Sequence, residues 1–212
     1  MILEPLTFEQ LRLIVVVYTS SLVPLVLIPY LYINNKVPAW VPYIYATFFI
    51  VCALGWELWF NYGLVYGDNV DLRRAAQLSA KLPIHINWLL NSLADSGTIC
   101  LGGLYLTWIF MKKNNSIFYK WNWKCFFILL TIFISQNILV EMFLYHDQLS
   151  VGKSLSWSPL TPLGPWINRM IFTFNERTIF LQSQFPWLLM TPIFYRFLIY
   201  FLNKYYKKGT IY

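Results

Sequence analysis

Five apolar runs alternate with shorter polar stretches along the chain. An α-helix rises about 1.5 Å per residue, so about 20 apolar residues cross a hydrocarbon layer of about 30 Å. The runs cover approximately residues 11–34, 39–61, 87–111, 124–146 and 183–203. This pattern predicts an all-α integral membrane protein, with a single domain over residues 1–212 that forms a five-transmembrane-helix bundle.

The connections between the runs differ in character. Residues 61–86 are polar and mixed, which predicts a loop with a short interfacial helix over Leu72–Lys81. Residues 147–182 contain Pro159, Pro162 and Gly164, which would break a helix. We therefore expect this segment, between the fourth and fifth spans, to be an extramembrane cap on the membrane surface.

Composition agrees with a bilayer location and excludes several classes of function. Only 12% of residues are charged, against about 25% in a soluble domain. The net charge of +7 could suggest nucleic acid as a partner. However, the basic residues stand at the ends of apolar runs, where they meet lipid headgroups, and this argues against nucleic-acid binding. The isolated cysteines Cys52, Cys100 and Cys125 have no metal-type spacing, so we expect buried thiols and no metal or cofactor.

The distribution of lysines predicts an orientation, because short cytoplasmic loops are enriched in basic residues. One side of the bundle receives most of them: Lys36, Lys112, Lys113, Lys120, Lys124, Lys204, Lys207 and Lys208. The N-terminus is then outside or lumenal and the C-terminus is cytoplasmic. The membrane would be the endoplasmic reticulum in a eukaryote or the inner membrane in a bacterium.

Three carboxylates lie inside the predicted spans, where each costs on the order of 3 kcal/mol. Glu57 is near the end of the second span, Asp95 is in the first half of the third, and Glu141 is in the fourth. An up-and-down path brings all three to the same end of the bundle. Polar residues in spans can be interhelical hydrogen-bond partners, worth about 0.6 kcal/mol each. Three mutually repelling carboxylates favour a functional pocket with an acid/base pair instead, and we predict Glu57, Asp95 and Glu141 as its catalytic residues.

Polar and aromatic side chains are expected to complete this pocket. The predicted substrate-binding residues are Asn91, Thr98, Gln136, Gln184, Trp187, Trp59 and His85. Asn91, Asp95 and Thr98 follow helical spacing and would share one face of the third span. An acid beside aromatic rings suits a hydrophobic substrate that passes through a carbocation.

Short motifs in four of the spans resemble those of the emopamil-binding protein family, the five-helix sterol isomerases and related sterol-binding receptors that share the EXPERA domain. Glu57-Leu58-Trp59-Phe60 is similar to the family's Glu-x-Trp-Phe in the second helix. Asp95 followed by Thr98 resembles its third helix, and Ser135-Gln136 its fourth. Gln184-x-x-Trp187-Leu188, with Pro192 beyond it, resembles its fifth.

The resemblance implies a lipid-accessible cavity of sterol size. Asp95 and Glu57 would protonate a ring alkene and remove a proton from the neighbouring carbon, Thr98 and Gln184 would position the ligand, and Trp187 would stabilise the cation. The family's isomerases carry a histidine where this chain has Ala53. Whether the chain is an enzyme therefore stays open at this point.

Two other interpretations remain. The Trp56-Glu57 pair also resembles small membrane terpene cyclases, although those have seven helices and a second acid in the last one. A third possibility is a non-catalytic lipid-binding or assembly subunit whose cap docks a partner or a second copy. All three predict a membrane location, and the first two predict a hydrophobic ligand, either a sterol or an isoprenoid.

Overall fold

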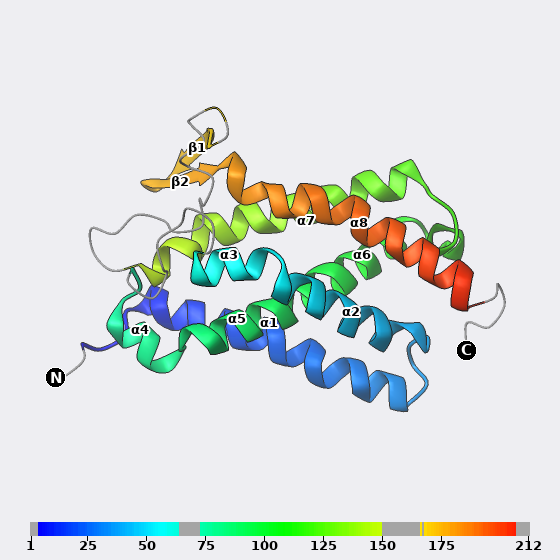
Figure 1. Cartoon of the computed structure of the whole chain (residues 1–212), viewed down its shortest axis with the longest axis horizontal. Helices are drawn as coiled ribbons and strands as arrows, with labels where there is room; N and C mark the ends of the chain where they lie inside the picture. The colour runs from blue at the N-terminus through cyan, green and yellow to red at the C-terminus, as the bar shows by residue number, and fades with distance from the viewer. Residues whose placement is uncertain (1–3, 64–72, 150–165, 167, 207–212) are drawn as a thin grey trace.

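A computed structural model describes residues 4–63, 73–149, 166 and 168–206. Its helices run side by side along one axis, and the start of the first helix and the end of the last lie at opposite ends of the bundle (Figure 1). Within the described residues, four helical stretches are long and apolar enough to cross a membrane: α1 (Phe8–Ile33), the continuous α5–η2–α6 (Ile84–Phe110), α7 (Trp123–Phe143) and α8 (Leu181–Tyr205). The bent pair α2 (Trp40–Leu54) and α3 (Trp56–Tyr62) makes up to five. The chain is thus a multi-pass helical membrane protein, and the predicted fold class is confirmed.

The second span is broken at Gly55, where α2 and α3 meet at 45°. A Cβ atom at this position would lie 2.6 Å from the carbonyl oxygen of Val51, so the close backbone approach requires glycine. The sequence predicted one continuous helix over 39–61. The break changes the direction of α3, which carries Glu57, relative to α2.

The third span is also irregular. Between α5 (Ile84–Ala94) and α6 (Gly102–Phe110), residues Asp95–Leu101 form a π-helix, η2. Such wide turns shift the phase of the residues that follow them. The predicted common face of Asn91, Asp95 and Thr98 is therefore divided, because the Thr98 hydroxyl donates a hydrogen bond to the Ser20 carbonyl of α1 instead.

Gly97 allows α1 and η2 to touch. A Cβ atom there would lie 2.4 Å from Cβ of Pro24 and 2.9 Å from the Tyr45 ring. Because Pro24 is inside α1 and cannot move away cheaply, Gly97→Ala should lower the free energy of unfolding by about 1–3 kcal/mol. Denaturant titration in detergent would measure this. Gly102→Ala, whose Cβ meets only a carbonyl oxygen at 3.8 Å, is the matched control and should stay near wild type.

The described parts of the connections outside the spans are partly regular. The described part contains the short helices α4 (Ala76–Lys81), η3 (Asn115–Phe118) and η4 (Tyr145–Gln148). The expected short helix is present as α4, although Leu72 lies outside the described residues, as do Lys207 and Lys208. Of the predicted cap, residues 150–165 and 167, with Pro159, Pro162 and Gly164, also lie outside them. Its remainder contains an antiparallel hairpin of β1 (Met170–Phe174) and β2 (Arg177–Phe180), which the sequence analysis did not predict.

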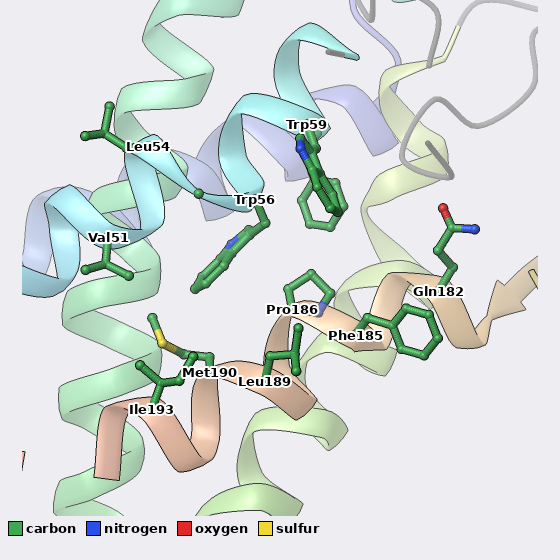
Figure 2. Close-up of a pocket in the computed structure, with 12 residues that line it drawn as sticks. Val51, Leu54, Trp56, Trp59, Gln182, Phe185, Pro186, Leu189, Met190 and Ile193 are labelled. Carbon is green, nitrogen blue, oxygen red and sulfur yellow. The ribbon is translucent and has the colours of Figure 1, made fainter. Parts of the chain in front are cut away.

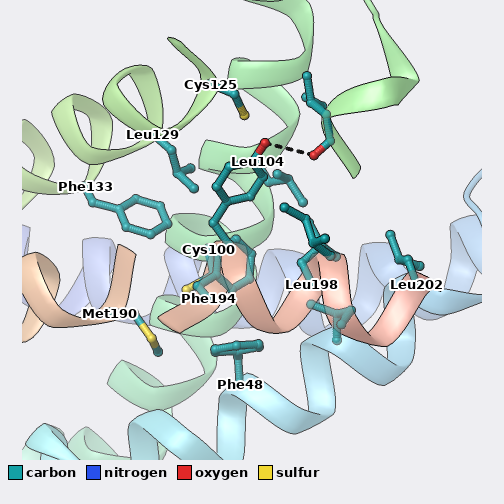
Figure 3. Close-up of a cluster of buried hydrophobic side chains, with 14 of the residues drawn as sticks. Phe48, Cys100, Leu104, Cys125, Leu129, Phe133, Met190, Phe194, Leu198 and Leu202 are labelled. Carbon is teal, nitrogen blue, oxygen red and sulfur yellow. Dashed lines mark hydrogen bonds between the residues drawn. The ribbon is translucent and has the colours of Figure 1, made fainter. Parts of the chain in front are cut away.

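The main hydrophobic core joins α2, η2, α6, α7 and α8. Figure 3 shows its centre, where Phe48, Phe133 and Phe194 pack with Cys100 and Leu198. At the end of this core beside η3, the Tyr195 hydroxyl donates a hydrogen bond to the Ile117 carbonyl at 2.9 Å. All three cysteines are free and fully buried, as predicted. This core fixes α8 against α2 and α7, and so positions the residues described next.

Candidate functional site

Glu57 lies in a buried polar network between α3 and α5. One turn further along α3, the Asn61 amide donates to the Glu57 carboxylate at 2.7 Å. The Asn87 amide, from α5, donates in turn to Asn61 Oδ1 at 2.6 Å. Glu57, Asn61 and Asn87 are each at most 4% exposed. With Asn91 and Tyr145 they line a polar cavity of about 20 Å³, which is room for about one water molecule.

Asp95 lies beside this network and is held by a tryptophan. The Trp56 indole donates to Asp95 Oδ2 at 2.9 Å, and its ring packs against that of Trp187 with centroids 5.4 Å apart. Asp95 is close enough to Glu57 to interact with it electrostatically. Because of the bend at Gly55, Trp56 at the start of α3 faces α8, whereas Glu57 faces α5.

Glu141, on α7, lies against the start of α8. Its Oε1 accepts from the Phe180 backbone N–H at 3.1 Å and the Ser183 hydroxyl at 2.8 Å, and its Oε2 accepts from the Gln184 amide at 2.8 Å. An acceptor at a helix N-terminus satisfies donors that have no partner within the helix. Glu141 therefore acts as a cap for α8 that is supplied by α7.

Asn137, one turn before Glu141, joins the same region to the aromatic residues. Its amide donates to the Ser183 carbonyl and to Gln184 Oε1, both at 2.8 Å. Its Oδ1 accepts from Tyr145 and Trp187, at 3.1 and 3.2 Å. Tyr145 also lines the small polar cavity with Glu57, so it joins the Asn137 region to the Glu57 network.

Next to these carboxylate networks, a triad of charged side chains links α1, the end of α7 and the hairpin. Asp147, whose side chain is fully buried, accepts from Arg12 of α1 and from Arg177 of β2, each at 2.6 Å. The neighbouring His146 lies outside the spans. Burial, and then the nearby Arg177, hold the pKa of His146 below its usual value, so this imidazole is neutral at pH 7.

An apolar groove of about 420 Å³ runs between the α2–α3 bend and α8, a size typical of small-molecule sites. In Figure 2, Trp56 and Trp59 lie above the groove and Pro186, Leu189 and Ile193 below it. Leu54, Leu189 and Ile193 are each more than half exposed, which opens the groove toward the lipid. The amide side chain of Gln182 lines the end near the hairpin (Figure 2).

No carboxylate lines the groove within the described residues. Glu57 faces the small polar cavity, and Glu141 is engaged by the α8 N-terminus. Trp56 belongs to both regions, because it lines the groove and its N–H holds Asp95. The indole therefore separates the apolar groove from the acidic network.

The structure brings together only some of the predicted pocket residues. Gln184 and Trp187 contact Asn137, and Asn91 lines the cavity with Glu57. Trp59 lines the groove. Thr98 points to α1, and His85 is at the exposed edge of the bundle, where its Nδ1 is 2.8 Å from the Tyr62 hydroxyl. Gln136 is half-buried on α7, and its Nε2 has no hydrogen-bond partner among the described residues.

Four residues of the network are not among the predicted pocket residues: Asn61, Asn87, Asn137 and Tyr145. Each is spaced by four residues from a predicted one. Asn61 follows Glu57, Asn87 precedes Asn91, and Asn137 and Tyr145 stand on either side of Glu141. The separation by Trp56 had no such signal, because it depends on the Gly55 bend.

No group of three His, Cys, Asp or Glu side chains in the described part of the chain is arranged to hold a metal ion. In comparisons with known proteins, the chain matches no family model, no curated protein and no solved structure. Functional inference therefore depends on the geometry of the groove and the network.

Proposed function

We propose that this membrane protein binds a neutral hydrophobic lipid, of the sterol or isoprenoid class, in the groove between α2–α3 and α8. The observation that carries the proposal is the groove itself: about 420 Å³, lined by apolar and aromatic side chains, and open to the bilayer. Its position within the spans lets a ligand enter from the membrane without crossing water.

The lining also favours a particular chemistry of ligand. Aromatic faces from Trp56, Trp59 and Phe185 suit a flat or branched hydrocarbon. Gln182 lines one end of the groove, where its amide donates to Asn168 Oδ1 at 3.3 Å. A ligand hydroxyl or carbonyl at that end would exchange with this hydrogen bond. No cation that could hold a phosphate lines it in the described structure, and this argues against a phospholipid.

Carbocation chemistry, as in an isomerase or cyclase, is the second candidate, supported by the hydrogen bond from Trp56 to Asp95. A ligand that displaced the indole would gain access to this acid. In the arrangement described, however, the acids lie behind Trp56 rather than in the groove. Binding therefore has more direct support than catalysis.

Photolabelling in nanodiscs tests the binding proposal. A diazirine-bearing sterol and a diazirine-bearing polyprenol are the probes, and saturable labelling of peptides from α8 and from the α2–α3 bend is expected with one of them. Ile193→Trp would fill the groove, and its affinity for that probe should fall at least about tenfold, which equals about 1.4 kcal/mol. Val26→Trp, at a position on α1 that is 68% exposed and outside the groove, is the matched control.

The same assay separates the outcomes. Non-saturable labelling that is equal in wild type, Ile193→Trp and Val26→Trp would mean ordinary lipid contact and would overturn the proposal. Asp95→Asn should keep binding in either case, since the carboxylate does not line the groove. Chromatography of the released probe then distinguishes the candidates: a product that wild type forms and Asp95→Asn does not would establish catalysis.

We further propose the orientation with the N-terminus outside and the basic end in the cytoplasm. Lys112, Lys113, Lys120 and Lys124 lie in or beside the α6–α7 connection, and Lys204 is in the last turn of α8. These cations are at the end of the bundle opposite the hairpin and α3 (Figure 1). The groove then opens in the outer half of the membrane.

A further inference from the structure

Strand β1 exposes apolar side chains that its small sheet does not cover. Met170 is 61% exposed, Ile171 45% and Phe172 36%, and Trp166 just before them is 70% exposed. A β-bulge between Met170 and Phe172 interrupts the pairing with β2. A two-stranded hairpin is marginal in water by itself, and several exposed apolar side chains gathered on one strand indicate a surface that is normally covered.

The hairpin is fixed firmly to the bundle. Arg177 of β2 pairs with Asp147 and also donates to the Met142 carbonyl at 3.0 Å. The Leu181 N–H, at the start of α8, donates to the Arg169 carbonyl at 2.8 Å. The turn at Asn175 and Glu176 has positive φ at both residues (46° and 62°), which is the tight hairpin geometry. The exposed strand therefore has a set height relative to the spans.

The hairpin directly precedes a candidate span. β2 ends at Phe180 and the α8 span begins at Leu181, and in Figure 1 the hairpin lies on the flank of the bundle beside the start of α8. Phe174 packs edge-on against Phe143, with ring centroids 5.3 Å apart. Because Phe143 is part of the exposed apolar surface of α7, the hairpin patch is continuous with the lipid-facing surface of the spans.

We propose that β1 is an interfacial anchor that inserts Met170, Ile171 and Phe172 into the headgroup–acyl boundary of the leaflet around the start of α8. Trp166 and Arg169, both exposed, flank the strand with the residue types that favour this layer. Lipid, rather than a protein, is the expected cover because the patch continues a surface that lipid already covers. The anchor is independent of the groove and would hold even if no ligand bound there.

Site-specific fluorescence in nanodiscs tests this. The native cysteines Cys52, Cys100 and Cys125 are fully buried, so an environment-sensitive NBD label will react selectively with an introduced thiol. Met170→Cys and Ile171→Cys report on the anchor, and each serves if the other fails to fold. Glu176→Cys, at the exposed turn, is the control in the same hairpin. The quenchers are phosphatidylcholine carrying a doxyl group near the headgroup, and aqueous iodide.

Labels on β1 should show blue-shifted emission, strong quenching by the doxyl lipid and loss of iodide quenching, whereas the label at position 176 should keep its iodide quenching. Iodide quenching on β1 equal to that at position 176 would place the strand in water and overturn the proposal. Protection from both quenchers would also overturn it, because a protein surface, such as a second copy, would then cover the strand.

Discussion

Replacing Asp147 with alanine is expected to lower the free energy of unfolding by about 3 kcal/mol. The carboxylate has no exposed surface and accepts from two guanidinium groups at 2.6 Å each. Its removal leaves Arg12 and Arg177 facing each other without a counter-charge. Both retain some exposure, 33% and 23% of the side chain, so water relieves part of the repulsion and the low end of the range for broken buried pairs applies.

Denaturant unfolding in detergent, monitored through the loss of tertiary structure, measures this effect. Asp147→Asn should fall between wild type and alanine, because the amide oxygen still accepts one hydrogen bond but the charge is lost. Glu176→Ala removes an exposed carboxylate from the hairpin turn and should change stability little. Equal stability of Asp147→Ala and Glu176→Ala would contradict the assigned role of the triad.

The triad matters because of the segments it joins. Arg12 is in the second turn of α1, Asp147 follows α7, and Arg177 begins β2. Each comes from a different part of the chain, and the Arg12 guanidinium also donates to the Phe143 carbonyl at 2.6 Å. Breaking it would loosen both α1 and the hairpin at one end of the bundle. No local pattern indicates the pairing, because Asp147 is 135 residues from Arg12 and 30 from Arg177.

The spans themselves could be predicted because the bilayer sets a length and an apolar composition that the sequence must meet. The clustering of Glu57 and Asp95 was also within reach, since antiparallel helices with short connections fix which ends meet. What composition could not supply is local backbone geometry. Gly55 breaks a mainly apolar run, and the π-helix that begins at Asp95 shifts the helical phase of the residues that follow it.

The hairpin shows a different limit. Its strands, Met170–Phe174 and Arg177–Phe180, are short, and their Asn175-Glu176 turn lacks the glycine typical of tight hairpins. The strands are stabilised by contacts with α7 rather than by strand propensity alone. Tertiary contacts of that kind cannot be read from a local pattern.

The second large loss of stability is expected for Glu141→Leu. This substitution distinguishes a structural from a catalytic role for Glu141. Leucine has a similar size but accepts no hydrogen bonds. The Phe180 N–H, the Ser183 hydroxyl and the Gln184 amide would each lose their acceptor on the carboxylate. Unpaired buried donors cost about 1–3 kcal/mol each, and interhelical bonds in membranes are at the lower end, so a loss of about 2–4 kcal/mol is expected.

Gln136→Leu is the matched control, because it makes the corresponding change on the same helix at a side chain whose Nε2 lacks a partner in the described structure. It should be neutral or slightly stabilising. Glu141→Gln should lose only about 1 kcal/mol, since its carbonyl oxygen can still accept from Phe180 and Ser183. The same denaturant titration compares all three. If Glu141→Leu is as stable as Gln136→Leu, the cap at the start of α8 is not what Glu141 provides, and the chemical role predicted from its position in the fourth span becomes the better explanation of a carboxylate at that depth.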